Sequence, residues 1–155
     1  MVGRSMAFPT EIIILLLIAL AIVAYGYFSS MRNTKFTVVK IGDAAVNAEI
    51  ADNSFKKMRG LMFRKSLGEI DGMIFPFDKE DYYGFWMMNT TIPLDMIWIN
   101  SSKQVVYIQK NAQPCMITSC PVYKNDKPAM YVLEVNAGFT DKHNIEVGTK
   151  AEFNI

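Results

Sequence analysis

The chain has 155 residues, of which 51% are hydrophobic and 20% are charged, and its formal net charge is +1. This length fits one domain plus an appendage and excludes a second enzyme-sized domain. The high apolar content argues against an intrinsically disordered chain. The nearly neutral charge argues against a nucleic-acid partner, because such partners attract strongly basic proteins.

The first element is an uncharged, strongly apolar segment at residues 12–28. A helix of this length spans about 26 Å, which together with apolar residues upstream is enough to cross a bilayer. Its Ile, Leu, Val and Phe side chains favour insertion. We therefore expect residues 1–30 to form an N-terminal membrane anchor. The alternative is a signal sequence, with Ala24 and Gly26 as the small residues before the cleavage site.

Two features bear on the orientation of this anchor, and they disagree. Basic residues after the segment, such as Arg32 and Lys35, favour a cytoplasmic C-terminal domain by the positive-inside rule. The only two cysteines, Cys115 and Cys120, are separated by Met-Ile-Thr-Ser in a loop that contains prolines, which favours a local disulfide in an oxidising compartment. We give the cysteines more weight and expect a single-pass membrane protein with an extracytoplasmic domain.

A short polar linker at 31–35 leads to a globular domain that we expect to cover 36–155. Residues 36–39 and 46–50 read as two strands, since apolar and polar residues alternate in the second, and Gly42-Asp43 supplies the turn between them.

One short amphipathic helix is expected next. Its apolar residues recur at helical spacing from Phe55 to Met62. Asp52, Asn53 or Ser54 can supply the N-cap.

The remaining apolar segments are short, rich in aromatic and β-branched residues, and separated by turn residues. They are residues 73–77, 83–88, 95–99, 104–109, 129–135 and 150–155. A proline-containing loop is expected at 110–128 and a polar turn at 141–144. Short strands without long helices between them imply antiparallel pairing. We therefore predict a mainly β fold, a small antiparallel β-sandwich or barrel with one or two short helices, preceded by one transmembrane helix.

Several motifs follow one another in a distinctive order. They are Arg59-Gly60-Leu61-Met62-Phe63-Arg64, Gly72-Met73-Ile74-Phe75, Phe85-Trp86-Met87-Met88-Asn89-Thr90, Pro93-Leu94-Asp95-Met96, Tyr131-Val132-Leu133-Glu134-Val135 and Ala137-Gly138. Over residues 46–153 the chain closely resembles domain-of-unknown-function family 192. The resemblance implies a small β-sandwich or barrel behind a signal sequence or anchor, and it implies no particular reaction. Family members often have lysine where this chain has Met88, so an anionic partner that would use that lysine is less expected here.

Four residues around the turn at Pro93 form the candidate ligand site. They are Trp86, Asn89, Thr90 and Asp95. Polar side chains at a strand end beside an aromatic ring are common at small-ligand sites. The alternative is structural, because Asn89 and Asp95 can bind turn backbone while Trp86 packs in the core.

Two arginines complete the candidate site. Arg59 and Arg64 can each hold a carboxylate or phosphate through two hydrogen bonds. Arg59 can equally pair inside the protein with Glu134 or Asp95, and Glu134 lies too far inside its strand to be expected at a solvent-facing site. The predicted ligand-binding residues are therefore Arg59, Arg64, Trp86, Asn89, Thr90 and Asp95.

These residues favour a binding module for a small molecule or a protein, without a cofactor, over an enzyme. One alternative is a small hydrolase-like enzyme that uses Asp95 and neighbouring polar groups, or Asp95 with Glu134, for which one carboxyl needs a raised pKa. A thiol nucleophile with His143 as its base is a further possibility, and it competes with the disulfide for Cys115 and Cys120.

The other alternative is a copper-handling protein. The single histidine argues against zinc and non-haem iron, so no metal site is predicted from histidines and carboxylates. The chain has 11 methionines, and thioethers near cysteine can hold Cu(I). The methionines concerned are Met73, Met87, Met88, Met96, Met116 and Met130. Methionine is also a common core residue, and Met73 and Met96 fall in strands that we expect to be buried.

Overall fold

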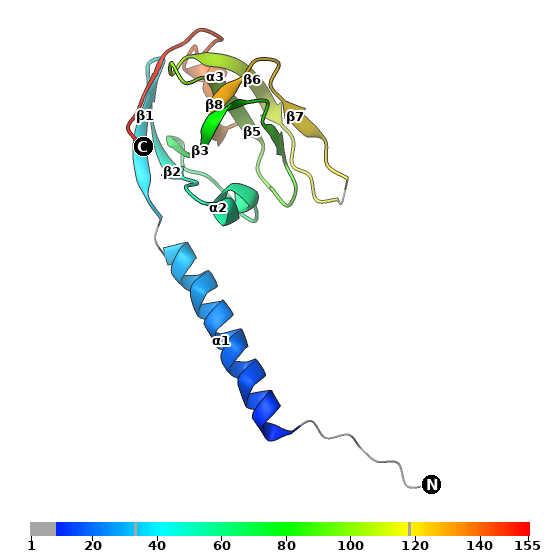
Figure 1. Cartoon of the computed structure of the whole chain (residues 1–155). Coiled ribbons are helices and arrows are strands. Elements are labelled where there is room, and N and C mark those ends of the chain that lie inside the picture. The colour runs from blue at the N-terminus through cyan, green and yellow to red at the C-terminus, as the bar shows by residue number, and fades with distance from the viewer. Residues whose placement is uncertain (1–8, 33, 118) are drawn as a thin grey trace. The chain divides into compact units, whose positions relative to one another are not determined.

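The computed structural model describes residues 9–32, 34–117 and 119–155. The chain divides into two units, one that ends at Thr34 and one that runs from Lys35 to Ile155. The first unit contains the helix α1 (Thr10–Arg32), and the strands all lie in the described part of the second unit (Figure 1).

The N-terminal helix corrects the prediction of a membrane anchor at residues 12–28. Over the residues that the structure describes, no helix combines the length and the apolar character needed to span a bilayer. The predicted transmembrane helix is therefore contradicted, and with it the predicted membrane location of an extracytoplasmic domain.

The second unit is mainly β, as predicted. Its strands are β1 (Phe36–Ile41), β2 (Ala44–Ile50), β3 (Asp71–Asp81), β4 (Gly84–Trp86), β5 (Leu94–Ile99), β6 (Val105–Ala112), β7 (Val122–Lys124), β8 (Ala129–Asn136) and β9 (Ala151–Glu152). Its helices are α2 (Ser54–Arg59) and α3 (Phe139–Lys142). Seven strands form one sheet in the order β6-β5-β8-β3-β2-β1-β9, and β4 pairs with β7 in a separate ribbon.

The seven-stranded sheet curls into a half-barrel (Figure 1). Backbone hydrogen bonds link its two edges at one end. The Val105 N–H donates to the Thr149 carbonyl at 2.9 Å, and the Ala151 N–H donates to the Lys103 carbonyl at 2.8 Å. This link covers part of two edges that would otherwise expose unpaired backbone groups.

One strand pair differs from the predicted antiparallel arrangement. β2 and β3 run parallel, with Ala48 opposite Gly72. A parallel pair needs a crossover connection. Residues 51–70, which include α2, make this connection, so the sheet is mixed and not a symmetrical sandwich.

Local signals explain the turn and the helix that the sequence predicted. Gly42 has φ +60°, and a Cβ atom there would lie 2.9 Å from the His143 carbonyl oxygen, so glycine is needed. The Asn53 side chain accepts a hydrogen bond from the Lys56 N–H at 2.9 Å and caps α2.

Hydrophobic residues cover both faces of the curled sheet. One cluster includes Val39, Val46, Ile74, Ile97, Leu133, Phe139 and Ile145. The other includes Leu61, Met73, Phe75, Met87, Met96, Trp98 and Val132. Because β5 lies between the two clusters, all six of its residues are buried.

Candidate functional site

A pocket of about 310 Å³ opens beside α2 and β4, on the face of the sheet that carries the second cluster. Its lining comes from the end of α2 and the residues after it, from β3, from β4 and from β8. The lining residues are Lys57, Met58, Arg59, Gly60, Leu61, Met62, Phe75, Phe77, Tyr83, Gly84, Phe85, Trp86, Thr90 and Glu134.

Aromatic rings form much of the pocket lining, and we call them the aromatic wall: Phe75, Phe77, Tyr83, Phe85 and Trp86. The Phe77 and Tyr83 rings stack with centroids 3.6 Å apart, and Phe85 meets Phe75 edge to face at 5.0 Å. The indole N–H of Trp98 donates to the Tyr83 carbonyl at 3.0 Å and so ties the start of β4 to the core. Trp86 remains 43% exposed at the pocket.

Glu134 is the acidic residue of the pocket lining. It lies within β8, opposite Met96 of β5 and Met73 of β3, and is only 4% exposed. Burial raises the pKa of its carboxyl to about 8, and the positive charge of Arg64 opposes this rise. The carboxyl is therefore mostly protonated at pH 7 and can donate a hydrogen bond.

The two predicted arginines have different surroundings. Arg64 does not line the pocket, because its guanidinium binds both carboxylate oxygens of Glu49, with Nη2 2.7 Å from Oε2. This bidentate pair fixes the loop after α2 to β2. Arg59 lines the pocket and is not without a partner in the protein. A third cation, Lys57, places its Nζ 4.8 Å from the centroid of the Phe77 ring.

Asn89 and Thr90 follow β4 in the chain. Thr90 lines the pocket and is 4% exposed, whereas Asn89 does not line it. Asn89 has φ +53°, a region in which asparagine is enriched. Its N–H donates to the Cys115 carbonyl at 2.9 Å, and its carbonyl accepts from the Phe63 N–H at 2.8 Å. The backbone of Asn89 thus joins the loop after α2 to the cysteine loop.

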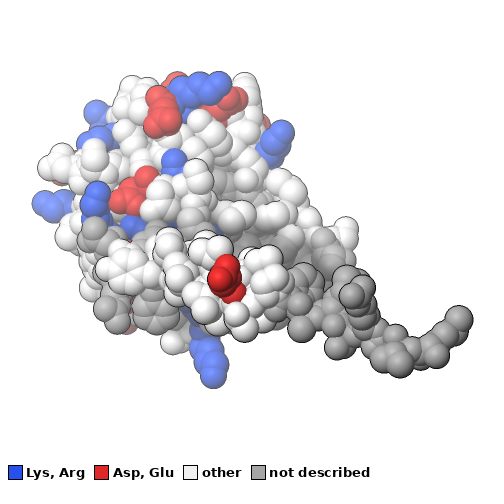
Figure 2. Space-filling view, turned by 60° about the horizontal axis from the view of Figure 1, so that its bottom comes forward, with Lys and Arg blue, Asp and Glu red and all other residues white. Residues whose placement is uncertain are grey.

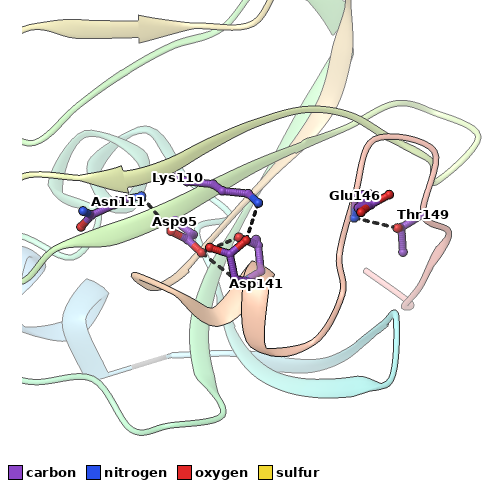
Figure 3. A network of polar contacts seen from close by, with 7 residues as sticks. Asp95, Lys110, Asn111, Asp141, Glu146 and Thr149 are labelled. Atoms are coloured by element: carbon purple, nitrogen blue, oxygen red, sulfur yellow. Dashed lines mark hydrogen bonds and ion pairs between the residues drawn. The ribbon is translucent and has the colours of Figure 1, made fainter.

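Asp95 does not line the pocket, and it points to the opposite face of the sheet because its neighbour Met96 pairs with Glu134. Its polar contacts are shown in Figure 3. Asp95 is completely buried. One of its oxygens accepts from the Asn111 N–H at 2.8 Å. The other accepts from the Thr140 N–H at 3.0 Å and from the Thr140 hydroxyl at 2.7 Å. These bonds connect β5 to β6 and to α3, which is a structural role.

Cys115 and Cys120 form a disulfide with Cα atoms 5.9 Å apart. Cys115 also forms backbone bridges with Met88 and Thr90, so the closed loop adjoins the wall of the pocket. Both sulfur atoms are used in the bond and no thiol is left as a nucleophile or a soft metal ligand. Met73, Met87 and Met96 are core residues. The described residues contain no cluster of three or more His, Cys, Asp or Glu side chains that could hold a metal ion.

The predicted ligand site left out the acid, one lysine and four aromatic residues of the lining, although the sequence analysis weighed Glu134 as a partner of Arg59 or Asp95. These residues are Lys57, Phe75, Phe77, Tyr83, Phe85 and Glu134. One signal could have found the acid, because Glu134 interrupts the apolar run of β8, and a carboxylate in such a run is rarely buried without a special environment.

The molecular surface shows no preference for one sign of charge on the face seen in Figure 2. Basic and acidic side chains are interspersed there, with wide uncharged areas between them. This distribution matches the small net charge of +1.

Proteins of similar sequence were found in two archaea. A UPF0127 protein of Pyrococcus furiosus is 28% identical over 120 residues, which cover 76% of this chain and 95% of the relative. A UPF0127 protein of Thermococcus sibiricus is 28% identical over 107 residues, which cover 69% of this chain and 66% of the relative.

Two crystal structures share the fold. One is a Sinorhizobium meliloti 1021 protein whose name proposes a transcription regulator, with a TM-score of 0.72 and 30% identity over 77% of this chain and 95% of that one. The other is a protein of unknown function from Novosphingobium aromaticivorans DSM 12444, with a TM-score of 0.68 and 34% identity over 77% of this chain and 84% of that one. The DUF192 family model, described as an uncharacterised ACR, matches residues 37–153. The expected resemblance is thereby confirmed, and the chain belongs to the DUF192 family.

Proposed function

We propose that the domain binds a small molecule with an apolar, ring-sized body in the pocket beside α2 and β4. The observation that carries the proposal is the combination of an aromatic wall with one buried acid, Glu134. Small-ligand sites are commonly apolar cavities in which a few polar groups fix the orientation of the ligand. A volume of about 310 Å³ lies at the lower end of the range for such sites.

The pocket supports binding better than hydrolysis. Asp95, the acid of the hydrolase alternative, lies on the other face and already accepts three hydrogen bonds. Of the two hydroxyl groups among the lining residues, that of Tyr83 donates to the Lys79 carbonyl and that of Thr90 contacts the Met88 carbonyl. An acid without an adjacent nucleophile and base lacks the usual hydrolytic arrangement.

A titration of the full chain with 2-phenylethanol tests the proposal. The alcohol should bind saturably, and the backbone amide NMR signals that shift should belong to the pocket lining. Trp86→Ala should weaken binding roughly fivefold, because it removes an aromatic contact. Phe36→Ala is the matched control, since Phe36 is an exposed aromatic residue on β1 outside the pocket. Shifts that map elsewhere, or equal weakening by both variants, would contradict the proposal.

A further inference from the structure

We infer that the ligand of this pocket carries an ammonium group, which lies against the Glu134 carboxylate while the apolar body of the ligand packs among the rings. This inference rests on the proposed binding function and names the chemical class of the ligand.

The first argument is the position of the acid. Glu134 is 4% exposed, and a carboxyl group at such a position is costly to ionise without a nearby cation. Arg64 is the cation whose charge acts on it, and both terminal nitrogens of Arg64 already bind Glu49. Within the described part of the chain, Glu134 is in none of the ion pairs. The pocket therefore presents an acid for which a ligand can supply the positive charge.

The second argument is the aromatic wall. The face of an aromatic ring attracts a cation, and rings grouped around a cavity recognise alkylammonium ligands. The protein already uses this attraction, because Lys57 places its own ammonium group 4.8 Å from the centre of the Phe77 ring. Phe77 stacks on Tyr83, and Phe85 contacts both Phe75 and Phe77. A ligand ammonium group beside Glu134 would thus meet a carboxylate and ring surfaces together.

The third argument concerns orientation. Lys57 and Arg59 also line the pocket, and both are more exposed than Glu134. Their positive charges repel an ammonium group near them and favour its placement beside the buried acid. The charge distribution of the lining therefore selects a ligand whose positive end points inward.

Three probes of matched size test this inference on the full chain: phenethylamine, 2-phenylethanol and phenylacetate. At pH 8.5 the amine should bind about tenfold more tightly than the alcohol, and phenylacetate should bind most weakly. Glu134→Gln should remove the preference for the amine while the affinity for the alcohol stays within about twofold. Glu152→Gln, which changes an exposed acid on β9, is the matched control and should leave the preference unchanged.

A pH series on the unmodified chain gives an independent readout. The amine requires ionised Glu134, whose pKa is about 8, so its affinity should rise several-fold between pH 7 and pH 8.5. The affinity of the alcohol should not rise over this range. If the alcohol binds as tightly as the amine, or the affinity of the amine falls as pH rises, the inference is overturned and the proposed binding function stands. If none of the three probes binds, both fail.

Discussion

Asp95 and Glu134 are two buried acids on neighbouring strands, and their surroundings give them opposite roles. In the pairing of β5 with β8, Asp95 lies opposite Val135 and Met96 lies opposite Glu134. Because successive side chains of a strand point to opposite faces, the two carboxyl groups lie on opposite sides of the sheet. Asp95 accepts three hydrogen bonds, whereas Glu134 lines a pocket and has a raised pKa.

This difference shows how the surroundings assign a role to a carboxyl group. Donors from Asn111 and Thr140 replace the water that the Asp95 carboxyl group lost on burial, so this group serves to position α3. The surroundings of Glu134 are largely apolar, so its proton is retained near neutral pH. The acid that resembled a site residue in the sequence is structural, and the one set aside for its position within a strand lines the pocket.

The largest expected effect comes from Asp95→Ala. The change leaves two backbone N–H groups and one hydroxyl without their acceptor, so the free energy of unfolding should fall by about 4 kcal/mol. Urea unfolding of the full chain measures this loss. Asp141→Ala is the control, because the Asp141 side chain forms an exposed ion pair with Lys110 in the same region (Figure 3), and its loss should cost less than about 1 kcal/mol. A loss below 1 kcal/mol for Asp95→Ala would contradict its structural role.

The next effect is a pH-dependent one at Glu134. The folded pKa of about 8 exceeds the ordinary value of 4.5, so the folded state holds the proton more tightly than the unfolded state. Its contribution to stability is therefore complete below pH 4.5 and is lost as pH rises towards 8. Between pH 5 and pH 8, Glu134→Gln should gain about 3 kcal/mol in stability relative to the unmodified chain. Unfolding curves at both pH values check the sign, and a constant difference between the two proteins would exclude the raised pKa.

The smallest effect of the three concerns the disulfide. Replacing both Cys115 and Cys120 with serine should lower the free energy of unfolding by about 2 kcal/mol, because the ring that they close is short. Hydrogen exchange should distinguish the two faces. The Asn89 amide, which bonds to Cys115, should exchange faster, while the Thr140 amide beside Asp95 should be little affected. Equal acceleration at both amides would show that the two sides of the sheet are not independent.

Much of the β structure could be predicted from the sequence, because local patterns carry it. The alternation in β2, the turn at Gly42 and the Asn53 cap all act within a few residues. β7 and α3 were expected as loop and turn. β7 exists because it pairs with β4, and α3 is held by Asp95, so both depend on contacts distant in sequence.

The pocket was harder to predict for the same reason. Three residues of the predicted site, Arg59, Trp86 and Thr90, line the pocket. Trp86 and Thr90 are also close in sequence, at the β4 strand and just after it. The face on which Asp95 and Glu134 lie depends on strand register, which a single sequence does not reveal. The apolar segment at the N-terminus suggested a membrane anchor from hydropathy alone, and no helix over the described residues meets the requirements for a span.

The loop closed by the Cys115–Cys120 disulfide has a consequence for the affinity of the proposed ligand. Cross-linking acts mainly on the unfolded chain, so the restriction of this segment is already in place before any ligand arrives. A pocket wall that is already restricted loses little conformational entropy when a ligand binds. A larger part of the contact energy then appears as binding affinity. The position of Cys115 beside Met88 and Thr90 thus means that, for the proposed ligand, one edge of the pocket is already restricted by a covalent bond.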